Sequence, residues 1–484
     1  MQRQHPVGER VSDSKALKLG DMTLITVSAI LLLDTVAASA SVGVSSLFWW
    51  AFLGLTFFVP YGLINAELGT TYPEKGGIYA WVREAFGGRW ASRITWSYWV
   101  NNLLWTPSVF ILFASIFNQL FELELGLGTQ MAMGIGLLWL AVFVNILSLD
   151  IGKWVPNAGA TIKILVFVML IGGAFAHVAE NGTANRIDLA SLAPSLDDSL
   201  TYLSTIIYGM LGFELMCANP GEIDRPSRNI PRAILLSGFI IIALYALGTF
   251  AVLAAIPVDD INLVEGLVDT LYLFFGASEG GRTFAFALGI GILFTFFSNA
   301  VTWCIGCNRA AAEAAAEGEL PRFLAVEHRS FGTPLGAAVT TGIVGSVVIL
   351  LYGSLSGSNE ELFWSLFACS AVIFLLPYVG MVLAFAHLRR ADPDRPRPYR
   401  VPLPDAFARA IAAWCAAILL ISVTLLMVIP GEGVDWPVTI GVLVVIAAGE
   451  VTIRVSERRL AREIHARIEA RGGPPAPEQI GPSA

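Results

Sequence analysis

Long apolar stretches recur along the whole chain and are separated by mostly short polar segments. A helix that crosses a bilayer needs about 20 mostly apolar residues. Twelve stretches meet this requirement, and their centres lie near Ile30, Phe58, Val109, Leu138, Phe167, Ile207, Leu244, Ile292, Ile343, Ile373, Leu420 and Leu443. We therefore predict an all-α integral membrane protein with twelve transmembrane helices in residues 21–455, between tails at residues 1–20 and 456–484.

The composition and the placement of charge agree with a membrane protein. The chain is 55% hydrophobic and 14% charged, whereas about a quarter of the residues of an average soluble protein are charged. If both termini are cytoplasmic, all of the 30 lysines and arginines except Arg186 and Arg282 fall on the cytoplasmic side. This asymmetry follows the positive-inside pattern. We expect a multi-pass protein of a cell membrane, the plasma membrane of a bacterium, surrounded by membrane lipids.

Residues that could catalyse a reaction or hold a metal form no recognisable motif. The five histidines are scattered over span ends, loops and tails, and the sequence contains no H-E-x-x-H, G-x-S-x-G or phosphate-loop motif. Cys304 and Cys307 have the spacing of a redox or zinc motif, but they lie in an apolar helix without a second pair or a histidine cluster. We predict no enzyme activity, metal, cofactor or nucleic-acid partner.

Two of the predicted spans have an unusual composition. The first contains DTVAASASVGVSS at residues 34–46, a string of small and hydroxyl residues headed by a carboxylate, and the sixth contains YGMLGFE at residues 208–214. Glycine and small residues let a helix unwind easily, and unwound backbone inside a membrane protein can bind a ligand. Close helix packing is the alternative explanation for small residues in a membrane helix.

The two segments supply most of the candidate binding residues. The first and sixth spans begin two five-helix units, at about residues 21–180 and 199–390, and helices at about residues 406–455 are additional. Because five is odd, the second unit enters the membrane from the opposite side. Paired interruptions in two inverted halves point to the central site of a transporter. The candidate substrate-binding residues are Asp34, Ala37, Ala38, Ser39, Ala40, Ser41, Gly43, Asn102, Tyr208, Gly209, Gly212 and Phe213.

Three charged residues lie within predicted spans, namely Asp34, Lys163 and Glu214. A charge near the middle of a membrane is unfavourable unless it has a partner, a proton or a ligand. A buried ammonium group can exchange a proton as a site opens, so Lys163 is a candidate for proton coupling. The alternative is that its side chain extends to the cytoplasmic surface. Glu214 is the second candidate for proton coupling, either sharing a proton or tying helices together.

Residues 60–90 read PYGLINAELGTTYPEKGGIYAWVREAFGGRW, and residues 212–233 read GFELMCANPGEIDRPSRNIPRA. These stretches resemble the ends of helices 2 and 6 and the following loops in the amino acid-polyamine-organocation superfamily of permeases. The resemblance covers roughly residues 17–455, and IPVDDIN at residues 256–262 is similar to the glutamate/GABA antiporters in particular. It implies the five-plus-five inverted repeat of the leucine transporter, followed by two extra helices.

The resemblance also implies roles for individual residues. Tyr208, Gly209, Gly212 and Phe213 would form the helix 6 break and an aromatic gate, and the next half-helix would present its N-terminal amides to an anionic group. Lys163 matches a helix 5 lysine that takes the place of a sodium ion in proton-coupled members. In helix 1, ASASVG replaces the usual glycine-serine-glycine break, and the carboxylate one turn earlier could meet a substrate amine. Other residues that could line the path are Asn101, Trp105, Asn299 and Ser370.

We expect a secondary transporter that moves an amino acid or a related amine by proton symport or substrate exchange, with alternating access, as a monomer or homodimer. An amine- or polyamine-specific antiporter and a non-transporting amino acid sensor are the alternatives. The major facilitator superfamily also has twelve spans, but YPEKGGIYAWVREAFGGRW replaces its usual D-R-x-G-R type loop between helices 2 and 3.

Overall fold

We describe a computed structural model of the chain, which covers residues 17–73, 77–147, 149–194, 202–217, 223–429 and 433–470. Helices make up nearly all of this part of the chain. Its strands are β1 (Val428–Ile429) and β2 (Gly433–Val434), an antiparallel pair in which Val428 lies opposite Val434. The prediction of a helical membrane protein is confirmed. Residues 1–16 and 471–484 of the predicted tails lie outside the described residues.

Ten helices in the described part of the chain are long and apolar enough to cross a membrane. The first is Ser46–Thr71, which runs through α3 (Ser46–Leu53), the π-helical turn η1 (Gly54–Phe58) and α4 (Val59–Thr71). The other nine are α6 (Gly88–Leu120), α7 (Leu127–Leu147), α8 (Leu149–Asn181), α11 (Pro226–Ala255), α13 (Glu279–Ala316), α14 (Leu335–Gly353), α15 (Asn359–Ala391), α16 (Asp405–Met427) and α17 (Trp436–Ala470).

The two remaining predicted spans, near Ile30 and Ile207, are each divided into two short helices. Residues 31–35 separate α1 (Leu19–Ile30) from α2 (Val36–Ala40), and residues 209–213 separate α9 (Leu203–Tyr208) from α10 (Glu214–Cys217). The connections between the long helices contain the short helices α5 (Ile78–Phe86) and α12 (Gly266–Phe275) and the 3-10 turns η4 (Val258–Asp260) and η5 (Arg322–Ala325).

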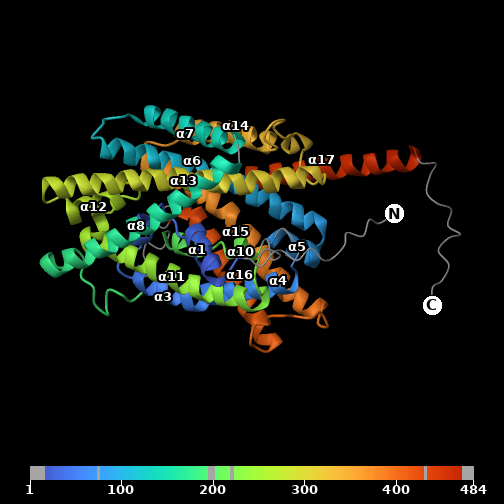
Figure 1. Ribbon diagram of the computed structural model, residues 1–484, viewed down its shortest axis with the longest axis horizontal. Coiled ribbons are helices and arrows are strands. Elements are labelled where there is room, and N and C mark those ends of the chain that lie inside the picture. The colour runs from blue at the N-terminus through green and yellow to red at the C-terminus, as the bar shows by residue number, and fades with distance from the viewer. Residues whose placement is uncertain are drawn as a thin grey trace.

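The long helices run roughly along one axis of the molecule, with the broken helices α1 and α10 and the long helix α15 near its centre (Figure 1). α6 and α15 are the most enclosed of the ten, because most of their apolar residues are buried inside the protein. In α7, α8, α14, α16 and α17, more than half of the residues in the apolar 18-residue stretch are not buried inside the protein. Such faces suit a bilayer, since every backbone group of a helix is already paired and its apolar side chains can face lipid.

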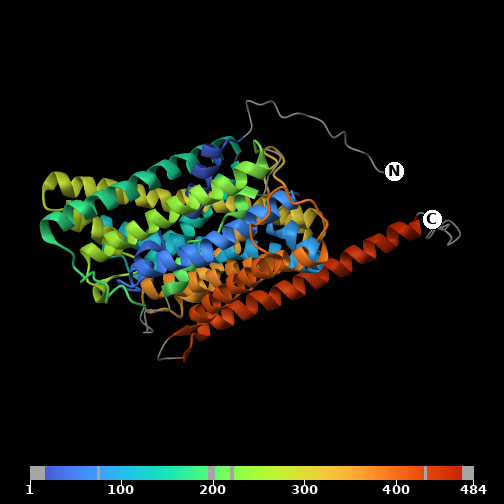
Figure 2. The ribbon, with the colours of Figure 1, turned by 90° about the horizontal axis from the view of Figure 1, so that it is seen from below.

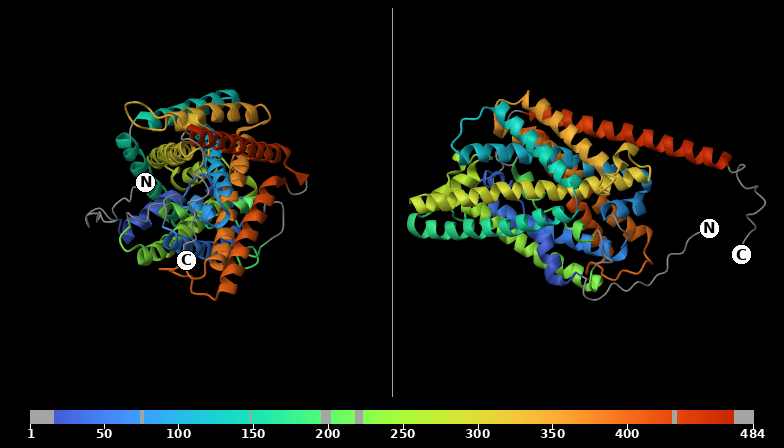
Figure 3. Two further views of the ribbon diagram at one scale, coloured as in Figure 1. Left: turned by 90° about the vertical axis from the view of Figure 1, so that its right-hand side faces the viewer. Right: turned by 45° about the horizontal axis from the view of Figure 1, so that its top comes forward.

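α17 lies along the outside of the bundle and extends well beyond it (Figures 2 and 3). Its 35 residues correspond to about 50 Å of helix, which exceeds the hydrocarbon core of about 30 Å. The second half of α17 is rich in arginine, including Arg454, Arg458 and Arg462. α17 is therefore long enough to cross a membrane and continue beyond it as a basic segment.

A buried ion network joins α4 to α15 and to the α15–α16 connection. Glu67 accepts hydrogen bonds from Arg389 Nε at 2.8 Å, from Arg389 Nη2 and from the backbone N–H of Val401 at 2.7 Å, and it pairs with Arg397 at 3.3 Å. Arg389 also donates to Asp405 at 2.8 Å. The side chains of Glu67 and Arg389 are almost completely buried. The network fixes the ends of three helices on one side of the bundle.

We predict that Glu67→Ala lowers the free energy of unfolding by about 3–5 kcal/mol, because removing one partner leaves an uncompensated buried charge. The matched control is Glu84→Ala, since Glu84 pairs with Arg395 at 3.4 Å on the surface, and such pairs contribute less than about 1 kcal/mol. The melting temperatures of the two purified variants in detergent, each compared with that of the wild type, test this prediction. Equal melting temperatures for the two variants would contradict a stabilising role for the network.

Candidate functional site

The first broken helix is interrupted by a tyrosine from another helix. The backbone N–H of Leu32 donates to the hydroxyl oxygen of Tyr245 at 2.7 Å, and the same hydroxyl donates to the carbonyl of Ile30 at 2.9 Å. Insertion of a side chain into the i to i−4 ladder is an established cause of a break. Tyr245 lies on α11, is fully buried and stacks on Trp50 at 4.6 Å between ring centroids. A tertiary contact thus imposes this break.

The position of the first break differs from the prediction. The sequence places it in ASASVG, one turn after Asp34, whereas the structure breaks the helix at residues 31–35 and so puts Asp34 inside the break. The small residues Ala37, Ala38, Ser39 and Ala40 are buried in α2, where their backbone is helical and the Ser39 hydroxyl donates to the Thr35 carbonyl at 2.7 Å. Close helix packing, the alternative explanation for small residues in a membrane helix, therefore applies to these four residues. Ser41 and Gly43 lie in the turn after α2, and Gly43 has a φ of 88°.

The second break packs directly against the first. Gly212 has a φ of 129°, and a Cβ atom at this position would lie 2.9 Å from Cγ1 of Ile30. Both the backbone conformation and the close approach therefore require glycine. The N–H of Gly212 donates to the hydroxyl of Tyr61 at 3.3 Å. Gly209 follows α9, and its Cβ position would meet Tyr245 and Trp50 at 3.3–3.4 Å.

Glu214, the first residue of α10, is buried among three tyrosines. Its carboxylate accepts hydrogen bonds from the hydroxyls of Tyr61 at 3.2 Å, Tyr98 at 3.0 Å and Tyr378 at 2.8 Å. These tyrosines come from α4, α6 and α15. Three donors satisfy an ionised carboxylate and connect α10 to three long helices. The sequence shows that Glu214 needs a partner, but it gives no sign of which residues provide one.

Asp34 lies in the first break, and only one of its two carboxylate oxygens has a hydrogen-bond partner among the described residues. The indole N–H of Trp105 on α6 donates to Oδ2 at 3.1 Å. Oδ1 is buried and has no hydrogen-bond partner among the described residues. Asp34 as a whole is 3% exposed. A buried carboxylate oxygen without a donor is unfavourable.

A group of aromatic rings connects the surroundings of the two carboxylates. Trp105 lies edge to face with Trp303, and Trp303 lies edge to face with Phe374, with 6.2 and 5.9 Å between the ring centroids. The ring centroid of Phe374 is 5.3 Å from that of Tyr208 and 5.8 Å from that of Tyr98. Trp105 and Tyr98 are seven residues apart on α6, which separates them by about 10 Å along the helix. Trp303 and Phe374 therefore connect Trp105, which binds Asp34, to Tyr98, which binds Glu214.

Lys163 on α8 is buried beside the first break. Its ammonium group donates to the carbonyl of Ser28 and to Oδ1 of Asn299, both at 2.9 Å. Lys163 is 1% exposed, so the alternative that its side chain extends to the surface is wrong. The ammonium also attracts the carboxylate of Asp34 electrostatically. Lys163 thus ties α8 and α13 to the end of α1.

The remaining candidates have other surroundings. Asn102 donates to Sγ of Cys304 at 3.4 Å and accepts from Thr106 at 3.2 Å, so it links α6 to α13. Phe213 stacks on Phe58 with 4.6 Å between ring centroids, and its ring centroid lies 5.8 Å from that of Tyr61. Its place in an aromatic gate stays a prediction. Ser370 donates to a carbonyl of its own helix, and Oδ1 of Asn101 is buried without a partner in the described part of the chain.

Sequence reasoning missed the tyrosines that organise the site. Tyr245, Tyr61, Tyr98 and Tyr378 lie on four different helices, far in sequence from the breaks that they bind. A weak signal exists on α6, where Tyr98, Asn101, Asn102 and Trp105 share one face at helical spacing. The sequence alone does not tell which neighbour this face meets.

Interrupted membrane helices whose ends meet inside the bundle are typical of secondary transporters. The family model described as "Amino acid permease" matches residues 17–448. The chain belongs to this family, within the amino acid-polyamine-organocation superfamily, and is a multi-pass membrane protein. The members that it resembles are transporters, which agrees with the expectation that it is not an enzyme.

Several relatives have a named activity. A protein named "Probable agmatine/putrescine antiporter" from Lactococcus lactis subsp. lactis is 34% identical over 438 residues, which are 89% of this chain and 93% of that protein. A glutamate/gamma-aminobutyrate antiporter of the same organism is 25% identical over 424 residues, which are 81% of this chain and 79% of that protein. A probable polyamine transporter of Arabidopsis thaliana is 24% identical over 362 residues, which are 73% and 68% of the two chains.

We predict that Tyr245→Phe loosens the first break, because the N–H of Leu32 and the carbonyl of Ile30 lose their shared partner and are left unsatisfied. Hydrogen–deuterium exchange of peptides covering residues 28–36 should become at least about fivefold faster, as a loss of about 1–3 kcal/mol implies. Tyr352→Phe is the matched control, since its hydroxyl bonds to Pro437 between α14 and α17. Unchanged exchange in Tyr245→Phe would show that the hydroxyl does not hold the break.

Proposed function

We propose that this chain is a secondary antiporter of small organic amines and that Asp34 binds the ammonium group of the substrate. The observation that carries this proposal is the buried Oδ1 of Asp34, which lies in a helix break and has no partner among the described residues. An ammonium group supplies the donors and the opposite charge that this atom lacks. The similarity to an agmatine/putrescine antiporter and to a polyamine transporter supports an amine as the substrate.

The second break favours an amine over an amino acid. A substrate carboxylate would need free amides at the start of the half-helix α10, as the family resemblance implies. Glu214 is the first residue of α10 and is buried, so a second carboxylate at this end would meet a like charge in a region of low dielectric. The backbone of Ala37 to Ala40 in α2 is already helical. A cationic substrate avoids the repulsion and suits both breaks.

The aromatic group supports binding of the same kind of substrate. The faces of tryptophan, tyrosine and phenylalanine rings attract cations. Trp105, Trp303, Phe374 and Tyr208 form a series of ring contacts that begins at Trp105, the hydrogen-bond partner of Asp34. A short amine with a cationic group at one or both ends would have a carboxylate at Asp34 and aromatic faces along its length.

Lys163 gives the site a means of coupling transport to protons. Its ammonium and the substrate cation would compete for the single charge of Asp34, because both are attracted to that carboxylate. A proton on Lys163 then weakens substrate binding, and loss of the proton strengthens it. Competition for one site makes exchange of two cations the natural cycle. Glu214 is the second proton-coupling candidate, since its proton would change the three tyrosine bonds that join α10 to α4, α6 and α15.

The membrane arrangement follows from the same proposal. Counting α1 with α2 and α9 with α10 as single interrupted spans adds two to the ten long helices. The resulting twelve spans would form inverted repeats at about residues 21–180 and 199–390, with extra helices at about residues 406–455 and both termini in the cytoplasm. Alternating access would expose the two breaks to one side of the membrane at a time.

We predict that Asp34→Asn impairs exchange of radiolabelled putrescine or agmatine in proteoliposomes. The concentration for half-maximal exchange should rise at least about 30-fold, since loss of one partner of a buried charge pair costs about 2–5 kcal/mol. Asp260→Asn changes an exposed carboxylate in the same way and should leave exchange intact. Unchanged affinity in Asp34→Asn, or exchange of glutamate instead of amines, would refute the amine site.

We predict that Lys163→Gln keeps some amine exchange but loses its dependence on a pH gradient, because the amide can still donate to Ser28 and Asn299 and cannot release a proton. Uptake into proteoliposomes at several external pH values, with the internal pH fixed, measures this. Arg186→Gln, which removes a cation that is 90% exposed, is the control. Full pH dependence in Lys163→Gln would assign the coupling to another group.

A further inference from the structure

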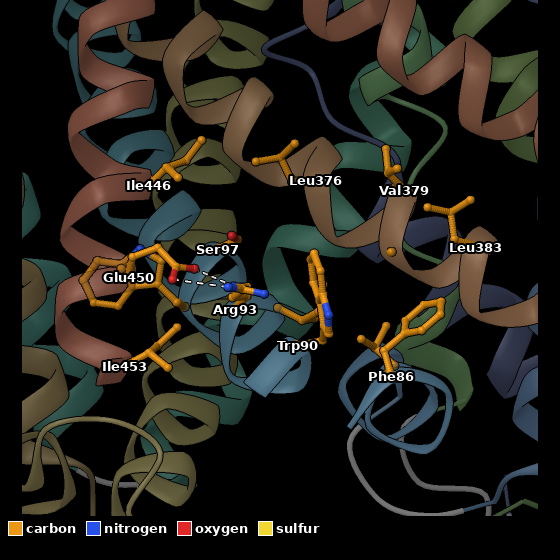
Figure 4. A pocket seen from close by; sticks show the side chains of 15 residues that line it. Phe86, Trp90, Arg93, Ser97, Leu376, Val379, Leu383, Ile446, Glu450 and Ile453 are labelled. Carbon is orange, nitrogen blue, oxygen red and sulfur yellow. Dashed lines mark hydrogen bonds and ion pairs between the residues drawn. The ribbon is translucent and has the colours of Figure 1, made fainter. Parts of the chain in front are cut away.

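A separate cavity lies on the outside of the bundle, where α17 diverges from α5, α6 and α15. Its volume is about 530 Å³. Its wall is formed by apolar side chains from all four helices, with Leu376 and Leu383 facing Trp90 across the opening and Ile446 and Ile453 closing one side (Figure 4). This groove shares none of the residues of the two breaks.

The groove is open where lipid would surround the protein. Trp90 is 52% exposed, and Leu383, Ile446 and Phe86 on the rim are also large exposed apolar side chains. Water would find few partners on such a wall. An empty groove would forfeit the dispersion contacts of its lining. A flexible hydrocarbon chain from the bilayer satisfies both conditions.

One end of the groove carries an excess of positive charge. Arg93 makes two hydrogen bonds to Glu450, at 2.5 and 3.2 Å, and its guanidinium lies 4.3 Å from the ring centre of Trp90 (Figure 4). Arg89 and Arg454 approach the same carboxylate at 3.6 and 3.9 Å. Glu457 adds one further acid, 3.8 Å from Arg89. Three arginines therefore face two carboxylates.

The two outer arginines have donors to spare. A guanidinium group has five N–H donors, and the ion pairs of Arg89 and Arg454 within the described residues are longer than a hydrogen bond. Their side chains are 45% and 61% exposed. Arginines at a membrane surface attract anionic lipids, and guanidinium groups bind phosphate through paired hydrogen bonds. The apolar groove and the basic end thus match the two parts of one molecule.

We propose that this groove binds an anionic phospholipid of the bilayer, with one acyl chain between α6, α15 and α17 and the phosphate at Arg89 and Arg454. The leaflet is the one that faces the arginine-rich extension of α17. Bound lipid would fill the space at the divergence of α17 and neutralise the excess charge beside Glu450. The inference does not depend on the substrate that the chain transports.

Native mass spectrometry of the protein equilibrated with mixed micelles of equal amounts of phosphatidylglycerol and phosphatidylcholine tests the proposal. The wild type should retain phosphatidylglycerol over phosphatidylcholine by at least about fivefold for each arginine that contacts the phosphate. Arg89→Gln combined with Arg454→Gln should bring the two lipids to equal retention. Leu383→Trp, which fills the groove from an exposed position, should reduce lipid retention at least about fivefold.

Leu351→Trp is the matched control, because Leu351 is exposed on α14 and its replacement should leave retention unchanged. A single peak in size-exclusion chromatography checks that each variant is folded. Equal retention of both lipids by the wild type would overturn the proposal. So would full retention by Leu383→Trp, or a lipid-free dimer in which Leu383→Cys forms cross-links showing that a second copy covers the groove.

Discussion

The hydroxyl of Tyr245 is the contact on which the site depends. Inside a membrane protein each backbone N–H and carbonyl needs a partner, and this one hydroxyl serves both the N–H of Leu32 and the carbonyl of Ile30. The chain can therefore leave the helix for residues 31–35 without unpaired groups at that step. Asp34 lies in this gap, and Gly212 of the second break fits against Ile30 at its edge. The two breaks therefore pack together as one site.

Three buried charges around the breaks are balanced differently. Glu214 receives three tyrosine hydroxyls, and Lys163 donates to two oxygens, so each is satisfied by the protein. Asp34 keeps one oxygen without a partner in the described residues. Of these three charged groups, Asp34 is therefore the one that keeps an unsatisfied atom, and its other oxygen binds the indole of Trp105. The proposed selection of a small cation, and its proposed competition with a proton, rest on that imbalance.

The sequence predicted the features that depend on the composition of a single segment of the chain. The apolar lengths of the helices, the two interrupted spans and the need of Asp34, Lys163 and Glu214 for partners are local properties. The place of the first break is not local, because Tyr245 is 213 residues away from Leu32 and it moves the break ahead of ASASVG. The tyrosines around Glu214 come from three helices, so no single stretch of the sequence predicts that they meet at this carboxylate. Small residues in α2, taken for a break, serve packing.

The central claim is that the carboxylate of Asp34 binds a substrate amine. The most direct measurement is the melting temperature of the purified protein, wild type and Asp34→Asn, with putrescine, agmatine or glutamate added, because a ligand that binds only the folded state raises that temperature. The account predicts a rise with both amines for the wild type, none for Asp34→Asn, and none with glutamate for either protein. A rise with glutamate alone, or an equal rise with putrescine in both proteins, would contradict it.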